Sequence, residues 1–313
     1  MSFASDVKNE LVRMDEESAC CEQSELAALL WMGGVVSFGG KGRLGIKFVT
    51  ENAAVARKVL RALKKAGIAD TEVKVTRALR LKKNNSYELR ALPSAVVGGF
   101  LEHMEILREG AFVESPANPP RRACCRKAWL RGAFLGGGSI NRPEVEYHLE
   151  LVTPNEGFAE TLVHVLKGFG LTAGMTTRKQ DFVVYLKEGD AITSFLGIIG
   201  AHEALLEFEN VRIVKGMRNQ VNRLVNCETA NLAKTVNAAV RQIEGIRLII
   251  RRRGLEALPR GLREVAELRL ANPEATLQEL VELFEGKISR SGMSHRLQSL
   301  ERMAEEFKEA KLS

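Results

Sequence analysis

The sequence has no apolar run long enough to cross a membrane, because Gly, charged or polar residues interrupt each run well before about 18 residues. Its first residues, MSFASDVKNELVRMDEE, also lack the apolar core of a signal peptide. We therefore expect a cytoplasmic protein with no membrane partner. Its 313 residues, 45% of them hydrophobic, allow two or three domains with cores of their own.

The sequence also lacks the CxxC spacing that lets two thiolates face one zinc ion. Its five cysteines comprise two adjacent pairs, Cys20-Cys21 and Cys124-Cys125, and the single Cys227. This pattern favours small, buried apolar thiols over a metal site. We therefore expect neither a metal nor another cofactor.

Basic charge is concentrated in one stretch rather than spread along the chain. The net charge is +7, yet residues 1–210 are almost balanced, whereas residues 211–253 carry ten Lys or Arg against two Asp or Glu. Such a stretch is typical of phosphate contact, with a solvated helix face as the alternative. The candidate phosphate contacts are Lys215, Arg218, Arg223, Lys234, Arg241, Arg251, Arg252 and Arg253. We expect a helix from near Asn226 to the Arg run, where cations also suit the helix dipole.

Two segments of the chain resemble each other. ACCEQSELAALLWMGG at residues 19–34 and ACCRKAWLRGAFLGGG at 123–138 are identical at six of 16 positions, and residues 48–68 resemble residues 151–171 at an offset of 103. Each copy predicts the same order: a helix, a strand over 42–48 or 145–151, an amphipathic helix, a hairpin and a closing helix. We therefore expect two αββαββα-type halves, residues 1–111 and 122–210, joined by a Pro-rich linker over 112–121, and a second domain over 211–313.

The first helix of each copy is rich in small residues. Gly in a helix interior costs about 0.5 to 1 kcal/mol relative to Ala, which suggests that another backbone approaches closely. We expect the two helices to pack together on a pseudo-twofold axis and to join two sheets into one saddle. The residues predicted to form this contact are Leu26, Ala27, Ala28, Gly34, Leu130, Gly132, Gly136 and Gly138.

These two helices resemble degenerate copies of the LAGLIDADG motif of homing endonucleases. The blocks ACCRKAWLRGAFLGGGSI, YHLELVT, VNCETANLAKTVNAA and ISRSGMSHRL together resemble the WhiA family of bacterial transcription regulators, in that order and over nearly the whole chain. The resemblance implies a mixed α/β saddle domain of the α+β type, followed by an all-α helix-turn-helix domain. It also implies control of sporulation, or of cell division and chromosome segregation.

A LAGLIDADG nuclease needs a carboxylate at the base of each motif helix to bind the ions that hold the scissile phosphate. The equivalent positions here are Gly33 and Gly137, and neither residue can ligate a metal. The predicted strand faces also differ, because Lys47 and Lys74 suit phosphate in the first copy whereas Glu146 and Glu150 repel it in the second. We therefore expect no catalytic site.

Residues 261–309 predict three helices, the first from about Gly261 to Ala271. Thr276 can cap the second, Gly286 can break it, and Ser289 can cap the third. A helix, a short turn and a second helix form a helix-turn-helix. With Met293, Leu297 and Leu300 buried, the opposite face of the last helix suits base edges in the major groove. The candidate base-reading residues are Arg290, Ser291, Ser294, His295, Gln298 and Arg302, with Lys287 placed to contact phosphate.

The sequence thus favours a sequence-specific, double-stranded-DNA-binding regulator without enzymatic activity, found in the cytoplasm or on the nucleoid. Two alternatives stay open: an endonuclease that uses displaced acids, and a scaffold that meets DNA only incidentally. Whether the predicted saddle binds DNA, a protein or a small ligand stays open; a protein partner there would be a second regulator or a sigma factor.

Overall fold

The computed structural model describes residues 2–14, 18–77, 85–113, 119–285 and 287–309. Its contacts divide the chain into two compact units, Met1–Gly216 and Met217–Ser313. The division falls inside one helix, α8 (His202–Arg253), six residues beyond the expected domain boundary at residue 210.

The N-terminal unit contains the same seven elements twice, so the expected αββαββα plan is confirmed. In the first half they are α2 (Ala19–Gly33), β1 (Gly34–Phe38), β2 (Leu44–Thr50), α3 (Ala53–Lys65), β3 (Thr71–Arg77), β4 (Asn85–Ser94) and α4 (Ala95–His103). In the second half they are α5 (Ala123–Gly137), β7 (Gly138–Ile140), β8 (Leu149–Thr153), α6 (Glu156–Gly168), β9 (Gly174–Arg178), β10 (Asp181–Leu186) and α7 (Gly189–Ile199).

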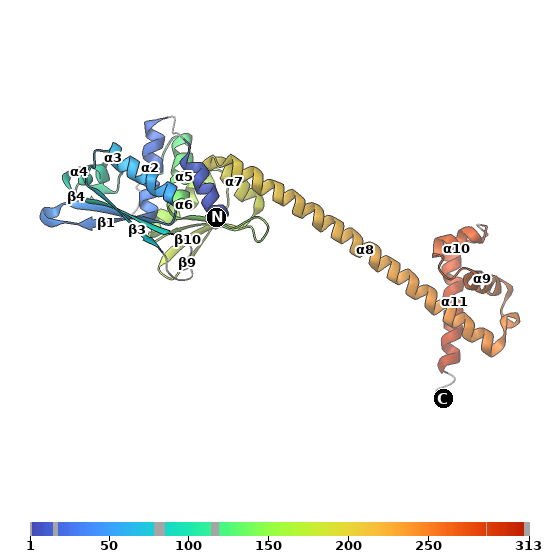
Figure 1. Ribbon diagram of the computed structural model, residues 1–313. Coiled ribbons are helices and arrows are strands. Elements are labelled where there is room, and N and C mark those ends of the chain that lie inside the picture. The colour runs from blue at the N-terminus through green and yellow to red at the C-terminus, as the bar shows by residue number, and fades with distance from the viewer. Residues whose placement is uncertain (1, 15–17, 78–84, 114–118, 286, 310–313) are drawn as a thin grey trace. The chain divides into compact units, whose positions relative to one another are not determined.

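Each half builds one antiparallel four-stranded sheet, in the equivalent orders β1-β2-β4-β3 and β7-β8-β10-β9. Matching caps start the equivalent helices, because the Asn52 side chain accepts from the amide of Val55 in α3 and the Asn155 side chain from that of Phe158 in α6. The helices of this unit lie on one side of both sheets (Figure 1), which leaves the other side of each sheet without helices in this view.

Helices α2 and α5 lie side by side at the centre of the unit. Both end at a glycine with an extended backbone, Gly34 and Gly138, from which a strand starts at once. The apolar residues of both halves, together with α1 (Phe3–Val12), form one continuous buried cluster. The two halves therefore share a core.

Several expected boundaries are wrong. Strands β1 and β7, which were not expected, follow the central helices directly. The strands expected at 42–48 and 145–151 begin later, at Leu44 and Leu149. A small hairpin of β5 (Leu107–Arg108) and β6 (Ala111–Phe112) closes the first half, which places Phe112 of the expected linker in a strand. Residues 114–118 of that linker lie outside the described residues.

The C-terminal unit contains the end of α8, then α9 (Arg260–Ala271), α10 (Leu277–Leu283) and α11 (Arg290–Glu309) around its own apolar core. The expected start of α8 near Asn226 is wrong, because the helix begins at His202. At a rise of about 1.5 Å per residue, its 52 residues are about 78 Å long. Within the described residues, no helix is long and apolar enough to span a membrane.

Candidate nucleic-acid interface

The C-terminal unit forms a helix-turn-helix from α10 and α11. Thr276 caps α10 in a capping box, in which the Glu279 amide donates to the Thr276 hydroxyl and the Glu279 carboxylate accepts from the Thr276 amide. Glu285 takes a left-handed backbone with φ of 56° in the turn, so it performs part of the helix-ending role expected of Gly286, which lies outside the described residues. The Ser289 hydroxyl accepts from the Gly292 amide at 3.2 Å and caps α11 as expected.

Helix α11 buries one side and leaves a polar side in solvent. Met293, Leu297, Leu300 and Ala304 are at most 2% exposed and face the core. On the other side, the candidate base-reading residues Arg290, Ser291, His295, Gln298 and Arg302 are exposed, and Ser294 is half-buried. The first acidic residue of α11 is Glu301, so the first three turns present no carboxylate to a polyanion.

Arg269, which the sequence analysis did not single out, fixes the loop that precedes this motif. Its side chain is 3% exposed and donates hydrogen bonds to the carbonyls of Asn272 and Ala275 and to the side chain of Gln242 in α8. Burial lowers the pKa of the Arg269 guanidinium from its ordinary value. Arg269 thus joins α8 to the loop just before the cap Thr276.

Gly245 brings α8 close to the back of α11. A Cβ added at Gly245 would lie 3.1 Å from the Cβ of Ala304, a separation that side chains seldom adopt. Because Ala304 belongs to the buried side of α11, the exposed polar face of α11 points away from α8. The helix-turn-helix therefore packs against α8 through the buried side of α11.

Four of the candidate phosphate contacts form a row on α8. At about 100° per residue, residues 223, 234, 241 and 252 lie within about 20° of one another around the helix axis. They span about 44 Å along it. All four side chains are exposed, and no Asp or Glu of this part of α8 lies on the same side of the helix. We call these residues the basic row: Arg223, Lys234, Arg241 and Arg252. Arg218 and Arg251 are also exposed but point elsewhere on the helix.

Three other candidates interact within the chain. Lys215 donates to the carbonyl of Val145 at 2.9 Å and lies over the Tyr147 ring. Arg253 lies over the ring of Phe307, and Lys287 forms an exposed ion pair with Glu285 at 2.7 Å. Arg253 also belongs to the last turn of α8, as expected for a cation that opposes the helix dipole.

Gly33 and Gly137, the two positions at which a LAGLIDADG nuclease is expected to carry acids, leave no space for a side chain. A Cβ at Gly33 would lie 2.9 Å from the ring of Phe48, and one at Gly137 would lie 2.4 Å from the carbonyl oxygen of Val152. In the described part of the chain, the one cluster of three or more potential metal-ligating side chains consists of cysteines.

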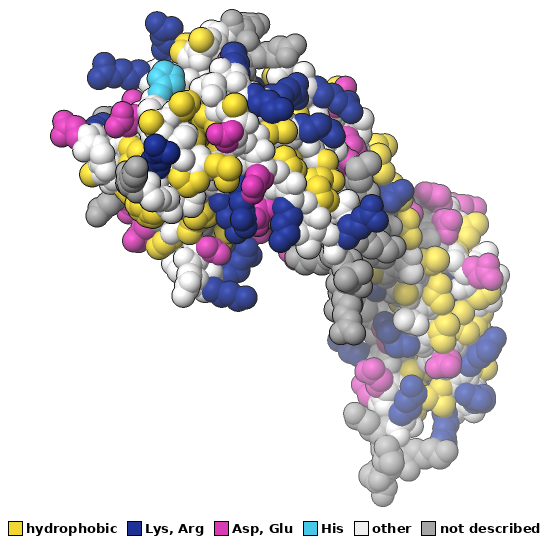
Figure 2. Space-filling model, turned by 60° about the vertical axis from the view of Figure 1, so that its left-hand side comes forward, with side chains coloured by type: hydrophobic (Ala, Val, Ile, Leu, Met, Phe, Trp, Pro, Cys, Tyr) yellow, Lys and Arg dark blue, Asp and Glu magenta, His cyan; other side chains and the backbone are white. Residues whose placement is uncertain are grey.

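The sheet faces of the N-terminal unit mix both signs of charge. In the first sheet the Glu88 carboxylate pairs with Lys47 at 3.3 Å and Arg90 at 2.5 Å. In the second sheet Glu150 pairs with Arg178 at 3.2 Å and lies 3.4 Å from His148. Figure 2 likewise shows basic and acidic side chains interspersed over the visible face of this unit. Over the residues that the structure describes, these faces lack the single-sign character that DNA-binding surfaces have.

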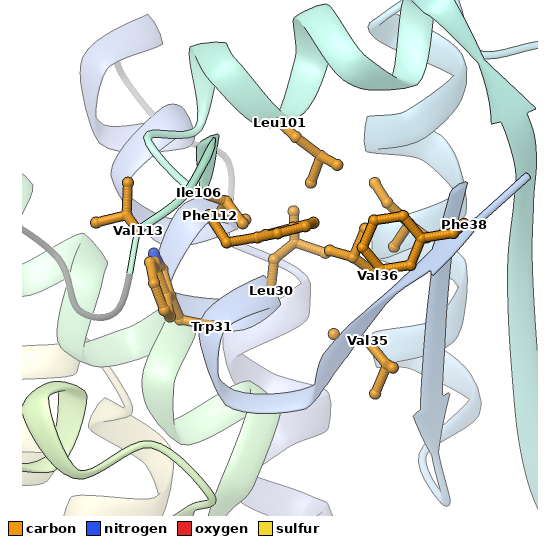
Figure 3. A pocket seen from close by; sticks show the side chains of 11 residues that line it. Leu30, Trp31, Val35, Val36, Phe38, Leu101, Ile106, Phe112 and Val113 are labelled. Atoms are coloured by element: carbon orange, nitrogen blue, oxygen red, sulfur yellow. The ribbon is translucent and has the colours of Figure 1, made fainter. Parts of the chain in front are cut away.

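An apolar pocket of about 330 Å³ opens between β1, α4 and the β5–β6 hairpin (Figure 3). Phe38 and Phe112 meet edge to face at its rim, with ring centroids 5.7 Å apart. Their exposed fractions, 75% and 42%, are high for phenylalanine, and Val35 beside them is 60% exposed. Exposed apolar groups gathered at one place are typical of a protein-binding surface.

The contact between α2 and α5 has a polar centre that the sequence analysis missed. Gly132 and Gly136 allow the approach, because a Cβ at Gly132 would lie 2.0 Å from the Glu25 carbonyl and one at Gly136 2.6 Å from the Met32 side chain. Ala28 and Leu130 are fully buried there. Leu26 and Ala27 are half-buried, and Gly34 and Gly138 end the two helices. Glu25 and Arg131, only 2% and 7% exposed, form an ion pair inside this contact.

Three family profiles match the chain: the WhiA N-terminal LAGLIDADG-like domain at residues 19–107, the WhiA LAGLIDADG-like domain at 126–218 and the WhiA C-terminal HTH domain at 221–304. Relatives named "Probable cell division protein WhiA" include that of Heliobacterium modesticaldum, 51% identical over 98% of this chain and 97% of its own. The relative from Desulforamulus reducens is 48% identical over 99% and 98%.

Solved structures agree with these matches. The crystal structure of full-length DUF199/WhiA from Thermatoga maritima is 29% identical, covers 98% of this chain and 99% of its own, and superposes with a TM-score of 0.61. The structure of an N-terminal LAGLIDADG domain of DUF199/WhiA is 26% identical, covers 64% of this chain and 90% of its own, and has a TM-score of 0.52.

Proposed function

The chain belongs to the WhiA family, and from this premise we propose that it is a sequence-specific transcription regulator that reads double-stranded DNA with α11. We propose that it acts on the nucleoid, in cell division, chromosome segregation or sporulation, and that it has no nuclease activity. The observation that supports DNA reading is the exposed polar face of α11 behind the Ser289 cap, which carries no carboxylate in its first three turns.

The face has the chemistry that base edges require. Gln298 can pair bidentately with adenine and Arg302 with guanine, while the short side chain of Ser291 permits a close approach near the helix N-terminus. Arg290 lies at the start of α11, where cations of recognition helices contact phosphate. Because Lys287 is held only by an exposed ion pair, which contributes little free energy, a phosphate can displace Glu285 from it.

The exposed cations of α8 supply the affinity that α11 alone lacks. Residues 254–313 carry nine basic against 11 acidic residues, so the module without α8 has no excess of positive charge. Arg218, Arg251 and the basic row add positive potential beside it. We propose that they contact phosphates, and that Lys215 and Arg253 serve their intramolecular contacts instead.

The test begins with selection of a preferred duplex by the full-length protein from a random pool, followed by footprinting. Gln298→Ala and Arg302→Ala should each weaken binding to the selected site by about 1 to 3 kcal/mol. Each should also reduce the sequence preference at one position of the site. Arg260→Ala, an exposed residue of α9 paired only with its neighbour Glu264, is the matched control and should change neither. An unchanged footprint and sequence preference in both α11 variants would overturn the proposal.

We propose that the protein has no nuclease activity because Gly33 and Gly137 leave no space for an acidic side chain. Even a Cβ there would collide with the Phe48 ring or the Val152 carbonyl oxygen. Incubation of supercoiled plasmid with the protein and Mg²⁺ or Mn²⁺ should leave the plasmid intact. Reproducible cleavage that Glu146→Gln removes would instead favour an endonuclease with displaced acids.

We also propose a protein partner, a second regulator or a sigma factor, for the apolar pocket beside Phe38 and Phe112. A photocrosslinking amino acid at Val35 should capture it in cells, and Phe38→Ser should abolish the crosslink without changing DNA affinity. A crosslink that persists in Phe38→Ser would remove the pocket from consideration.

A further inference from the structure

The four cysteines of the two sequence pairs converge between the halves of the N-terminal unit. Cys20 and Cys21 belong to the first turn of α2, and Cys124 and Cys125 to the first turn of α5. Because these helices lie side by side, the sulfur atoms of Cys20, Cys21 and Cys125 are all within 4.8 Å of one another. The sulfur of Cys124 is 4.0 Å from that of Cys125.

The arrangement differs from the expectation of buried thiols. Neither pair has the CxxC spacing, but two adjacent pairs on neighbouring helices bring four thiols together. Only Cys21 and Cys125 are buried, whereas Cys20 is half-buried and Cys124 is exposed. The description as small buried apolar thiols therefore fits two of the four.

We propose that Cys20, Cys21, Cys124 and Cys125 bind one zinc ion, which joins the N-terminal ends of α2 and α5. Tetrahedral zinc with Zn–S bonds of about 2.3 Å places its sulfur ligands about 3.8 Å apart. The sulfurs of Cys20, Cys21 and Cys125 lie within 4.8 Å of one another, so movements of about 1 Å bring these three to that spacing. Rotation of the exposed Cys124 side chain, whose sulfur is 4.0 Å from that of Cys125, would supply the fourth ligand.

The surroundings favour the charge of such a site. Zinc with four thiolates carries an excess of two negative charges. The first turns of α2 and α5 both direct their positive ends toward the sulfurs, which favours thiolates there. The Arg122 guanidinium adds a positive charge, with its Nη1 3.9 Å from the sulfur of Cys20.

An ion can reach the cluster from solvent. Cys20 and Cys125 line a surface pocket of about 430 Å³, together with Gln23 and Arg108. Since one ligand pair comes from each half, the ion would tie the two halves together at the end of α2 and α5 opposite Gly33 and Gly137.

The test uses the full chain, reduced and freed of metal by chelation, and titrated with Co²⁺ as a spectroscopic substitute for zinc. We expect the thiolate-to-cobalt charge-transfer band to reach its plateau at one equivalent, and zinc to displace it. Cys21→Ser and Cys125→Ser should each lose most of the band. Cys227→Ser is the matched control, because Cys227 lies exposed on α8, and it should bind as the wild type does.

Alkylation gives a second readout that does not require a variant to fold. In the native protein with zinc, iodoacetamide should label Cys227 and spare the other four cysteines, and removal of zinc should expose Cys20 and Cys124 to the reagent. The proposal is overturned if the folded, reduced wild type shows no thiolate-cobalt band. It is also overturned if protection persists without metal as a disulfide, detected as an intact-mass decrease that a reductant reverses.

Discussion

The Nε atom of Arg131 in α5 lies 3.1 Å from Oε2 of Glu25 in α2, at the buried contact between the two halves of the N-terminal unit. Lys58 of α3 pairs with the same carboxylate, and Arg131 also donates to the carbonyl of Ile199 at the end of α7. Four helices thus meet at two charged side chains. Charges taken so far out of water persist only where partners offset the cost of desolvation.

Removal of one partner of this pair should therefore destabilise the protein strongly. We expect Glu25→Gln to lower the free energy of unfolding by about 3 to 5 kcal/mol, since it removes the carboxylate that Arg131 and Lys58 share. Chemical denaturation of the full chain measures this change. Arg260→Ala, which breaks the exposed pair with Glu264, should cost less than about 1 kcal/mol. Equal losses in the two variants would refute the buried pair's role.

Gly132 should be intolerant of any side chain. Its added Cβ would lie 2.0 Å from the backbone carbonyl of Glu25, so Gly132→Ala must push α2 and α5 apart and should cost several kcal/mol. Gly98, inside α4, has nothing within 4 Å of an added Cβ, so Gly98→Ala should stabilise by about 0.5 to 1 kcal/mol. Opposite shifts in melting temperature are the expected result, and a stabilised Gly132→Ala would contradict the packing described.

Because of Lys8, the stability of the N-terminal unit should change with pH in the alkaline range. Burial lowers its pKa from 10.5 to about 8, with an opposing effect of Glu51. The unfolded state therefore binds more protons between about pH 8 and 10.5, so the contribution of Lys8 to stability rises with pH across that range. Below pH 8 the buried charge is costly.

The variant Lys8→Met should thus be more stable than the wild type at pH 7, by about 1 to 2 kcal/mol after allowance for partial exposure. This gain should shrink as the pH approaches 10.5. Denaturant titrations at several pH values measure it, with the exposed Lys64→Met as control. A gain that is constant with pH would show that desolvation of the ammonium is not the cause.

The basic row of α8 should govern the salt dependence of DNA binding. Removing one cation that neutralises a phosphate should reduce the slope of log K against log salt by about 0.9, so replacing all four residues with Gln should reduce it by up to about 3.6. Arg218→Gln removes one proposed contact on another face of the same helix, so it should reduce the slope by no more than about 0.9. If the slope stays unchanged in the fourfold variant, the row does not contact phosphate.

Local patterns predicted much of the fold. The repeat predicted two equivalent halves and most of their elements, although not β1 and β7. A Thr or Ser before an apolar stripe located the caps of α10 and α11. The buried side of α11 followed from helical periodicity, because the alternative face offers only polar side chains.

The start of α8 could not be read in this way. Val221, Leu224 and Leu232 would mark a buried face by periodicity, yet they are 59%, 60% and 65% exposed, and Gly216 lowers the helix propensity of the segment before them. The thiol cluster and the Glu25–Arg131 pair also escaped prediction. They join residues about a hundred positions apart, and such contacts depend on how α2 and α5 pack rather than on any local spacing.

The Glu25–Arg131 pair has no counterpart across the pseudo-twofold axis. In the alignment of residues 19–34 with 123–138, Trp129 stands where a second Glu25 would be, and Ala27 where a second Arg131 would be. In a symmetric dimer of identical halves every contact occurs twice, so each surface must complement itself. Covalent fusion removes that demand, and the two helices here have become a donor and an acceptor that fit only each other. A symmetric dimer of one half alone would set Glu25 opposite Ala27 of the copy, or Arg131 opposite Trp129 of the copy, and so leave a buried charge without its partner across the axis.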